Sequence, residues 1–199
     1  MDQAPVDWER EVIADLYHSE TKHYIELCRK WRNTPKPSIA AVQGACIAAG
    51  LMLIWPCDLI IAADNAKFSD PVVLMGIGGV EYHCHTWEFG ARKAKEILFT
   101  SSSVDAETAE KLGMVNKVVT VDALMDETMA MAASIAGKPA FGLAMAKRAV
   151  NRTMDIMGHE NAIEQVFDIH ELGHGNAQAF TGQPIIAGLG KMKKELKKS

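Results

Sequence analysis

The stretch that decides the fold runs from Lys36 to Ala62 and reads KPSIAAVQGACIAAGLMLIWPCDLIIA. Ser38–Val42 is a short apolar and β-branched run, which predicts a buried strand that turns at Gln43-Gly44. Ala45–Pro56 is long and rich in Leu, Met and Ala, so we predict a buried helix that Pro56 ends. Asp58–Ala62 predicts the next strand. Strand, helix and strand in this order form a βαβ unit with parallel strands, which places this half of the chain in the α/β class.

Helical spacing dominates the rest of the chain. Apolar residues recur at three, four and seven positions from Val6 to Asn33, which predicts a long helix that ends before Pro35 and Pro37. Lys67-Phe68 predicts a short strand, and Met75–Tyr82 a turning loop. Further helices are predicted over residues 86–99, 105–112, 122–136, 140–157 and 160–172, with Asp105 and Asp122 as N-caps and Gly113 as a C-cap, followed by a last segment over residues 184–198.

The strands and the helices divide the chain into two regions. Residues 1–121 hold every predicted strand, and residues 122–199 are predicted to be entirely helical. The composition of 48% apolar and 23% charged residues with a net charge of −4 is typical of a soluble globular protein and gives no indication of nucleic-acid binding. No apolar run is long enough to span a membrane, and the N-terminus is charged where a signal peptide is apolar, so we expect a cytoplasmic protein.

The four cysteines are Cys28, Cys46, Cys57 and Cys84. They are widely spaced, and three of them lie among apolar neighbours. We therefore interpret most of them as small core residues rather than as a disulfide framework or a zinc site.

The segment most suited to chemistry is Ala48-Ala49-Gly50, where the predicted helix begins. Backbone N–H groups in the first turn of a helix have no hydrogen-bond acceptor inside the helix and lie at its positive end. They can stabilise the oxygen of a carbonyl that becomes an enolate, and one such preorganised donor is worth about 3 kcal/mol. The alternative is a close contact between helix and strand that simply requires small residues.

This part of the sequence resembles the crotonase (enoyl-CoA hydratase/isomerase) superfamily. The resemblance rests on Lys36–Gly44, Ala48–Gly50 and Cys57–Ala62, which match the K-P-x-I-A-A-V-x-G block, the small-residue turn and the C-D-x-x-x-A segment of that superfamily. Further matches follow in the same order at Ala66–Phe68, Pro71, Leu74–Gly76, Asp105–Glu107, Lys111–Val115 and Ala144–Lys147.

The resemblance implies a crotonase-like spiral of ββα and βαβ units with a C-terminal helical trimerisation region. It also implies a homo-oligomer, either a trimer or a hexamer, that binds an acyl-CoA thioester and needs no cofactor besides the coenzyme A of its substrate. In this family two backbone N–H groups hold the thioester oxygen. The second falls on Ala49, and Ala48, Gly50, Met75 and Gly76 are expected to line the substrate site.

The chain departs from the hydratases of the family at two positions. Their two glutamates match Met52 and Val72 here, and neither side chain can move a proton. Each general acid or base contributes about 100-fold to 10,000-fold to such a reaction, so hydration of the usual kind should be lost or strongly slowed. We still expect both side chains to line the substrate site.

The loop that follows offers replacement groups. Glu81 lies next to Val80, the position at which some isomerases of the family carry an acid, and is our candidate catalytic residue; the alternative is a surface glutamate near a helix start. His83 is expected as polar lining, and Asp70 as a second candidate base or simply a turn residue before Pro71. Neighbouring side chains on a strand point in opposite directions, so an extended segment would separate Cys84 from His83 and His85, which argues against a metal site at Glu81, His83, Cys84 and His85.

Both ends of the chain bear on the substrate site. The resemblance places Lys191, with neighbouring lysines, where the family meets the phosphates of coenzyme A, although a solvated helix end is an equal alternative.

Only 35 residues precede Lys36, far fewer than is usual in the family, and Met1–Pro35 contains no turn that would supply the first oxyanion N–H. Either the sequence begins at an internal methionine or the chain is naturally shortened; we favour the first.

Three functions therefore stay open. The leading hypothesis is an enzyme that acts on acyl-CoA through Ala49 and Glu81. The second is an acyl-CoA binder or oligomer partner without catalysis, which Met52 and Val72 favour. The third is a redox or metal protein built on His83, Cys84 and His85. The sequence does not specify the acyl chain.

Overall fold

The computed structural model of the protein describes residues 12–188 and residue 190. The chain enters along a continuous helical rod made of α1 (Val12–Glu20), a π-helical turn η1 (Thr21–Ile25) and α2 (Glu26–Asn33). The rod ends at Asn33, so the predicted stop before Pro35 is confirmed. The first residues of the predicted helix, 6–11, lie outside the described residues.

Two three-stranded sheets form the centre of the molecule. One has the strand order β1-β3-β6 and is parallel; the other has the order β2-β4-β5, with β2 and β4 parallel and β5 antiparallel to β4. The strands are β1 (Ile39–Val42), β2 (Ala45–Ile47), β3 (Leu59–Ala63), β4 (Lys67–Ser69), β5 (Val104–Asp105) and β6 (Lys117–Val119). Because β1 and β2, and then β3 and β4, alternate between the sheets, the chain advances as a spiral.

The predicted helix over residues 45–56 is wrong in its first part. Ala45–Ile47 is strand β2, paired in register with Lys67–Ser69, and helix α3 occupies only Ala49–Ile54. The parallel pairing of β1 with β3 is confirmed. Backbone hydrogen bonds to β4, which is distant in sequence, outweigh the helical preference of this apolar run.

Helices follow and surround the sheets. They are η2 (Val72–Met75), α4 (His85–Thr100), α5 (Ala106–Leu112), η3 (Val121–Ala123), α6 (Leu124–Ala136), α7 (Ala140–Ile156) and α8 (His159–Thr181). The caps of α5 are confirmed, since the Asp105 carboxylate accepts a hydrogen bond of 2.8 Å from the Thr108 N–H and Gly113 is left-handed with φ 90°.

Two predictions about the later helices are wrong. Asp122 is not an N-cap, because it lies inside η3, where its charge still suits the positive end of the helix. The helix predicted over residues 160–172 continues to Thr181 as α8. Gly173 does not end it, because this glycine packs against the backbone of Gly76 and Ile77, where an added Cβ would make close contacts of 3.2–3.3 Å.

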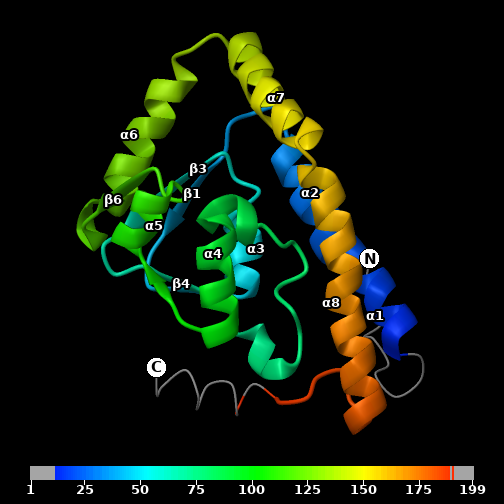
Figure 1. The fold of residues 1–199 in the computed structure, drawn as a ribbon. Helices are drawn as coiled ribbons and strands as arrows, with labels where there is room; N and C mark the ends of the chain where they lie inside the picture. Colours follow the sequence, from blue (N-terminus) through cyan, green and yellow to red (C-terminus); the bar gives the residue numbers. More distant parts are fainter. Residues whose placement is uncertain (1–11, 189, 191–199) are drawn as a thin grey trace, which may run out of the picture.

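Helix α6 packs on the β1-β3-β6 sheet, and α7 and α8 then lead back to the N-terminal rod. Figure 1 shows α6 and α7 as two arms, and α8 running beside α1 and α2. Arg29 pairs with Glu160 and Glu164 on α8, and Arg32 lies 2.9 Å from Asp155. Among the described residues every strand precedes residue 121. No single helix in this part of the chain has the length and apolar character to cross a membrane; the α6–α7 region passes only as a pair bent by 107°.

The main core lies between the sheets, α3, α4 and α8. Its most deeply buried members include Leu51, Phe68, Tyr82, Ile97 and Ile163. Cys28, Cys46 and Cys84 are buried, Cys57 is half-buried, and none forms a disulfide. The interpretation of most cysteines as core residues is confirmed.

The contact of α8 with the loop after η2 predicts how two glycines of the same helix differ. A Cβ at Gly173 would lie 3.2 Å from the Gly76 carbonyl oxygen, whereas a Cβ at Gly175 would meet no atom within 4 Å. We expect Gly173→Ala to lower the free energy of unfolding by about 1–3 kcal/mol through overpacking. Gly175→Ala should raise it by up to about 1 kcal/mol through helix propensity. Urea unfolding measures both, and equal stabilisation by the two variants would contradict the contact.

Candidate functional site

The turn from β2 into α3 holds the candidate oxyanion donor. Ala48 has φ 49° and ψ −109°, a conformation that costs an L-residue about 1–3 kcal/mol. Its N–H donates to the Ser69 carbonyl at 2.9 Å, which fixes the turn to β4. Ala49 is exposed and is the first residue of α3, so its N–H has no acceptor inside the helix. A Cβ at Gly50 would lie 3.2 Å from Cys46 Sγ, so small residues are also required here for packing.

The two positions that match the hydratase glutamates lie in apolar surroundings. Met52 is 3% exposed and belongs to the main core, and its carbonyl accepts a hydrogen bond from Cys28 Sγ at 3.3 Å. Val72 is half-buried and packs against the same core. The site therefore has no proton-transfer group at either position.

Asp70 points into the protein rather than outwards. Its side chain is fully buried, and Oδ2 accepts a hydrogen bond of 2.8 Å from the Val80 N–H. The same oxygen lies 2.9 Å from His85 Nε2. Asp70 therefore holds the loop between η2 and α4 in place, and its contact with substrate stays a prediction.

The Met75-Gly76 step is covered by a later part of the chain. The Met75 carbonyl accepts a hydrogen bond of 2.9 Å from the Ile186 N–H. Gly76 has φ 90°, and a Cβ there would lie 2.7 Å from the Ile186 side chain. The Met75-Gly76 segment therefore packs closely against Ile186.

Glu81 lies half-buried on this loop. Burial raises the pKa of Glu81 to about 7, although the positive charge of His170 partly opposes the rise. The carboxylate of Glu81 in turn adds to the effect of burial in raising the pKa of Cys28, whose sulfur contacts the Met52 carbonyl. Glu81 is therefore a carboxyl group that can gain or lose a proton near neutral pH in this region.

The other ionisable residues of the loop do not converge on one point. Burial and the neighbouring His85 lower the pKa of His83 to about 3, so His83 is neutral at physiological pH. The two rings are tilted by 43° to each other, with centroids 4.2 Å apart. Cys84 Sγ instead lies 3.7 Å from His159 Nε2. Within the described residues, the clusters whose ligand atoms converge lie elsewhere.

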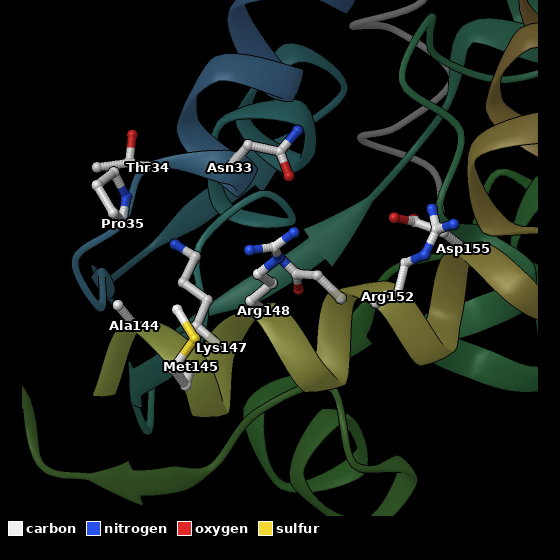
Figure 2. A pocket seen from close by; sticks show the side chains of 10 residues that line it. Asn33, Thr34, Pro35, Ala144, Met145, Lys147, Arg148, Arg152 and Asp155 are labelled. Carbon is white, nitrogen blue, oxygen red and sulfur yellow. The ribbon is translucent and has the colours of Figure 1, made fainter. Parts of the chain in front are cut away.

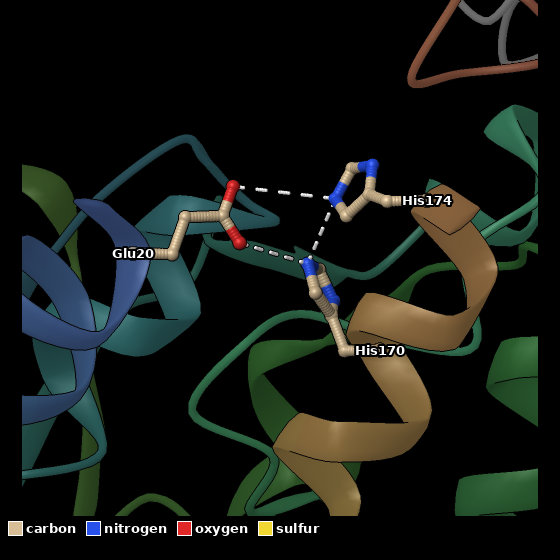
Figure 3. Close-up of side chains that lie close together, drawn as sticks. All are labelled: Glu20, His170 and His174. Atoms are coloured by element: carbon tan, nitrogen blue, oxygen red, sulfur yellow. Dashed lines mark hydrogen bonds and ion pairs between the residues drawn. The ribbon is translucent and has the colours of Figure 1, made fainter. Parts of the chain in front are cut away.

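One of those clusters was not predicted from the sequence. Glu20 on α1 meets His170 and His174 on α8, and Figure 3 shows the three side chains pointing towards one another. The sequence signal was present, because His170–His174 reads HELGH, a spacing that places two imidazoles on one face of a helix.

The described cavities lie away from the turn. One of about 670 Å³ is bordered by α7 and the end of α2, and Figure 2 shows Lys147, Arg148 and Arg152 around it. Lys147 is already paired with Asp58 at 2.8 Å. Ala48–Gly50, Val72 and Glu81 do not line this cavity. Lys191, the predicted phosphate contact, lies outside the described residues.

Comparison with known proteins gives a consistent result. A family model described as Enoyl-CoA hydratase/isomerase matches residues 9–178. A Mycobacterium tuberculosis protein provisionally named enoyl-CoA hydratase EchA13 is 43% identical over 170 residues, which cover 85% of this chain and 54% of that protein. The chain thus spans about half the length of this relative.

Solved structures agree with the fold. A protein from Mycobacterium smegmatis provisionally named enoyl-CoA hydratase superposes with a TM-score of 0.86 at 58% identity, covering 87% of this chain and 71% of that one. An enoyl-CoA hydratase/isomerase from Xanthobacter autotrophicus superposes with a TM-score of 0.76 at 29% identity, covering 85% and 66%. The predicted α/β crotonase-like fold is confirmed.

The raised pKa of Glu81 predicts a pH-dependent effect on stability. The folded chain holds this proton up to about pH 7, whereas the unfolded chain releases it near the ordinary value of 4.5. The bound proton on Glu81 therefore stabilises the folded chain fully below pH 4.5, and this stabilisation is lost as the pH rises through 7. Glu81→Gln should raise the free energy of unfolding at pH 8, relative to the wild type, by about 1–3 kcal/mol more than it does at pH 4.5. Chemical denaturation at the two pH values measures the difference, and a pH-independent effect would contradict the assignment.

Proposed function

The chain belongs to the enoyl-CoA hydratase/isomerase family, and on this basis we propose that it binds an acyl-CoA thioester and stabilises the enolate form of the thioester. The Ala49 N–H is the donor for the enolate oxygen. The observation that carries this proposal is the Ala48 backbone, which holds a strained left-handed φ at the one point where the family signature places its small-residue turn. Strain of this kind accumulates at functional sites and persists only where the surroundings enforce it.

Migration of a double bond fits the available groups better than hydration. Hydration by the two-glutamate route needs proton-transfer groups that Met52 and Val72 lack. Isomerisation of a 3-enoyl thioester needs one base, which takes a proton from C2 to give a dienolate and returns it to C4 to give the 2-enoyl thioester. We assign this base to Glu81, whose pKa of about 7 suits both taking and returning the proton.

The substrate site is built from the turn and the loop. Ala48, Gly50, Met52, Val72, Met75 and Gly76 would line it, with His83 and Asp70 as polar neighbours on the loop. The reaction requires no cofactor beyond the coenzyme A that the substrate carries. Lys191 keeps its proposed role as a phosphate contact.

A homo-oligomer, trimeric or hexameric, is part of the proposal. Large apolar side chains on the C-terminal helices are strongly exposed in the single chain, among them Phe141 and Ile156 on α7 at 77% each and Phe180 on α8 at 79%. Exposed apolar surface of this extent is typical of an interface. The C-terminal helices are therefore the proposed contact with further copies.

A second candidate function is acyl-CoA binding without catalysis, or partnership with an active homologue. The burial of Met52 in the core favours it, because the position of the first hydratase glutamate is closed to solvent. This candidate shares the turn at Ala49 with the first. It differs in predicting no contribution from Glu81 to any turnover.

Removal of the Ala49 donor tests the shared part of the proposal. Ala49→Pro deletes the N–H, and proline is tolerated at the first position of a helix. We expect the rate of 3-enoyl-CoA isomerisation to fall by about 100-fold to 1,000-fold, as for other single oxyanion donors. Ala49→Gly keeps the N–H, so its rate of 3-enoyl-CoA isomerisation should remain within about threefold of the wild-type rate. Wild-type rates in both variants, with thermal unfolding showing both to be folded, would remove Ala49 from the mechanism.

Glu81→Gln tests the base, and Glu88→Gln is a matched control because burial raises the pKa of Glu88 to about 7 as well. We expect kcat/KM of the wild type to rise with pH through about 7, as the carboxylate forms. Glu81→Gln should lose about 100-fold or more and the pH dependence with it, whereas Glu88→Gln should keep both. If calorimetry detects thioester binding but neither the wild type nor any variant turns the thioester over, the result would support the non-catalytic candidate instead.

A further inference from the structure

We propose that Glu20, His170 and His174 form a binding site for one divalent transition-metal ion of the zinc class. The two imidazoles come from successive turns of one face of α8, and the carboxylate comes from α1 across the helix contact (Figure 3). This inference goes beyond the proposed function and does not rest on it, because it concerns a different set of side chains and a different ligand.

The ligand atoms are spaced as a small coordination sphere requires. His170 Nε2 and His174 Nε2 are 3.0 Å apart, and the Glu20 carboxylate oxygens lie 3.2 Å from the first nitrogen and 4.0 Å from the second. Zinc bonds to nitrogen and oxygen of about 2.0–2.2 Å in a tetrahedral site separate neighbouring ligand atoms by about 3.3 Å. The three side chains therefore need only small shifts to bind one ion.

The hydrogen bonds on the far side of both rings fix which nitrogens are free. His170 Nδ1 lies 2.7 Å from the Gly79 carbonyl oxygen, and His174 Nδ1 lies 2.6 Å from the Pro184 carbonyl oxygen. A carbonyl only accepts, so each Nδ1 carries the proton and donates it. In the neutral rings both Nε2 atoms then present lone pairs to each other, and a cation or a proton must lie between them. Metal-ligating histidines are oriented by this same kind of contact to a carbonyl.

The charge balance around the cluster favours a metal ion over a single proton. Glu20 and Glu171 are 8% and 4% exposed, and Glu171 follows His170 directly in the chain. Neither Glu171 oxygen has a hydrogen-bond partner among the described residues, and Glu20 Oε2 has only its ion-pair contact with His170 there. Two buried carboxylates that face no lysine or arginine are strongly unfavourable, and a divalent cation compensates more of their charge than one imidazolium does.

A second cluster, where α7 ends and α8 begins, differs in its charge balance. Asp155, His159 and Glu160 also bring ligand atoms together. There, however, Arg32 lies 2.9 Å from Asp155, and Arg29 pairs with Glu160. In the part of the chain that the structure describes, no lysine or arginine forms such a pair with Glu20 or Glu171. The arginines already neutralise the second cluster, which makes it a suitable control.

The donor set indicates the class of metal and the effect of binding. Imidazole nitrogen combined with carboxylate suits zinc and similar ions, whereas calcium and magnesium prefer oxygen alone. The ion would join α1 to α8. Through His170 and the Gly79 carbonyl it would also stabilise the loop that carries Glu81.

Metal binding by the purified, tag-free chain tests the inference after treatment with a chelator and dialysis. Zn²⁺ is titrated by calorimetry, and Co²⁺ is added separately because its visible absorption reports a tetrahedral site. We expect one equivalent of Zn²⁺ per chain and a strong Co²⁺ spectrum. Glu20→Gln and His174→Ala should weaken Zn²⁺ binding by about 100-fold or more, since the loss of an outer hydrogen bond alone costs about 10-fold to 100-fold.

The control variant and the wild type make the inference refutable. His159→Gln should bind Zn²⁺ as the wild type does, and all variants are first checked for native circular dichroism. Absence of saturable Zn²⁺ and Co²⁺ binding by the wild type would overturn the site and leave a shared proton between the two rings. Equal loss of affinity in His159→Gln, or wild-type affinity in folded Glu20→Gln, would also overturn it.

Discussion

Burial of the loop from Gly76 to Cys84 under α8 is the constraint on which the rest of the candidate site depends. A buried loop must find partners for its backbone groups inside the protein. Asp70 supplies one by accepting from the Val80 N–H, and His170 supplies another by donating to the Gly79 carbonyl. Gly79 must lack a side chain, because a Cβ would lie 2.5 Å from His83 Nδ1. These contacts place Glu81 and His83 at fixed points, where burial changes the pKa of each.

The sequence predicted most elements that are defined by local pattern. The strand at residues 39–42, the parallel pairing with residues 59–62 and the caps at Asp105 and Gly113 follow from β-branched runs, turn residues and helix-end chemistry. The errors arose where distant contacts decide. Ala45–Ile47 is a strand because β4 pairs with it, and α8 continues through Gly173 because this glycine packs on the loop. Neither partner is visible in the local sequence.

The candidate site shows the same limit. Ordered motif matches located the turn at Ala49 and the replaced positions Met52 and Val72, because each lies close to its signature. They could not locate the meeting of Glu20 with His170 and His174, since about 150 residues separate Glu20 from His170. Only the four-residue spacing of the two histidines was available beforehand, and spacing on a helix does not identify the third ligand.

In the proposed site the Ala49 N–H polarises a bound thioester carbonyl, and vibrational spectroscopy can detect this polarisation. The carbonyl stretch of an acyl-CoA labelled with ¹³C at the thioester carbon is measured by infrared difference spectroscopy, free in buffer and bound to the chain. A preorganised donor lengthens the C=O bond, so we expect a lower stretching frequency for the bound carbonyl than for the free one. A bound carbonyl that absorbs at or above the frequency of the free thioester would contradict it.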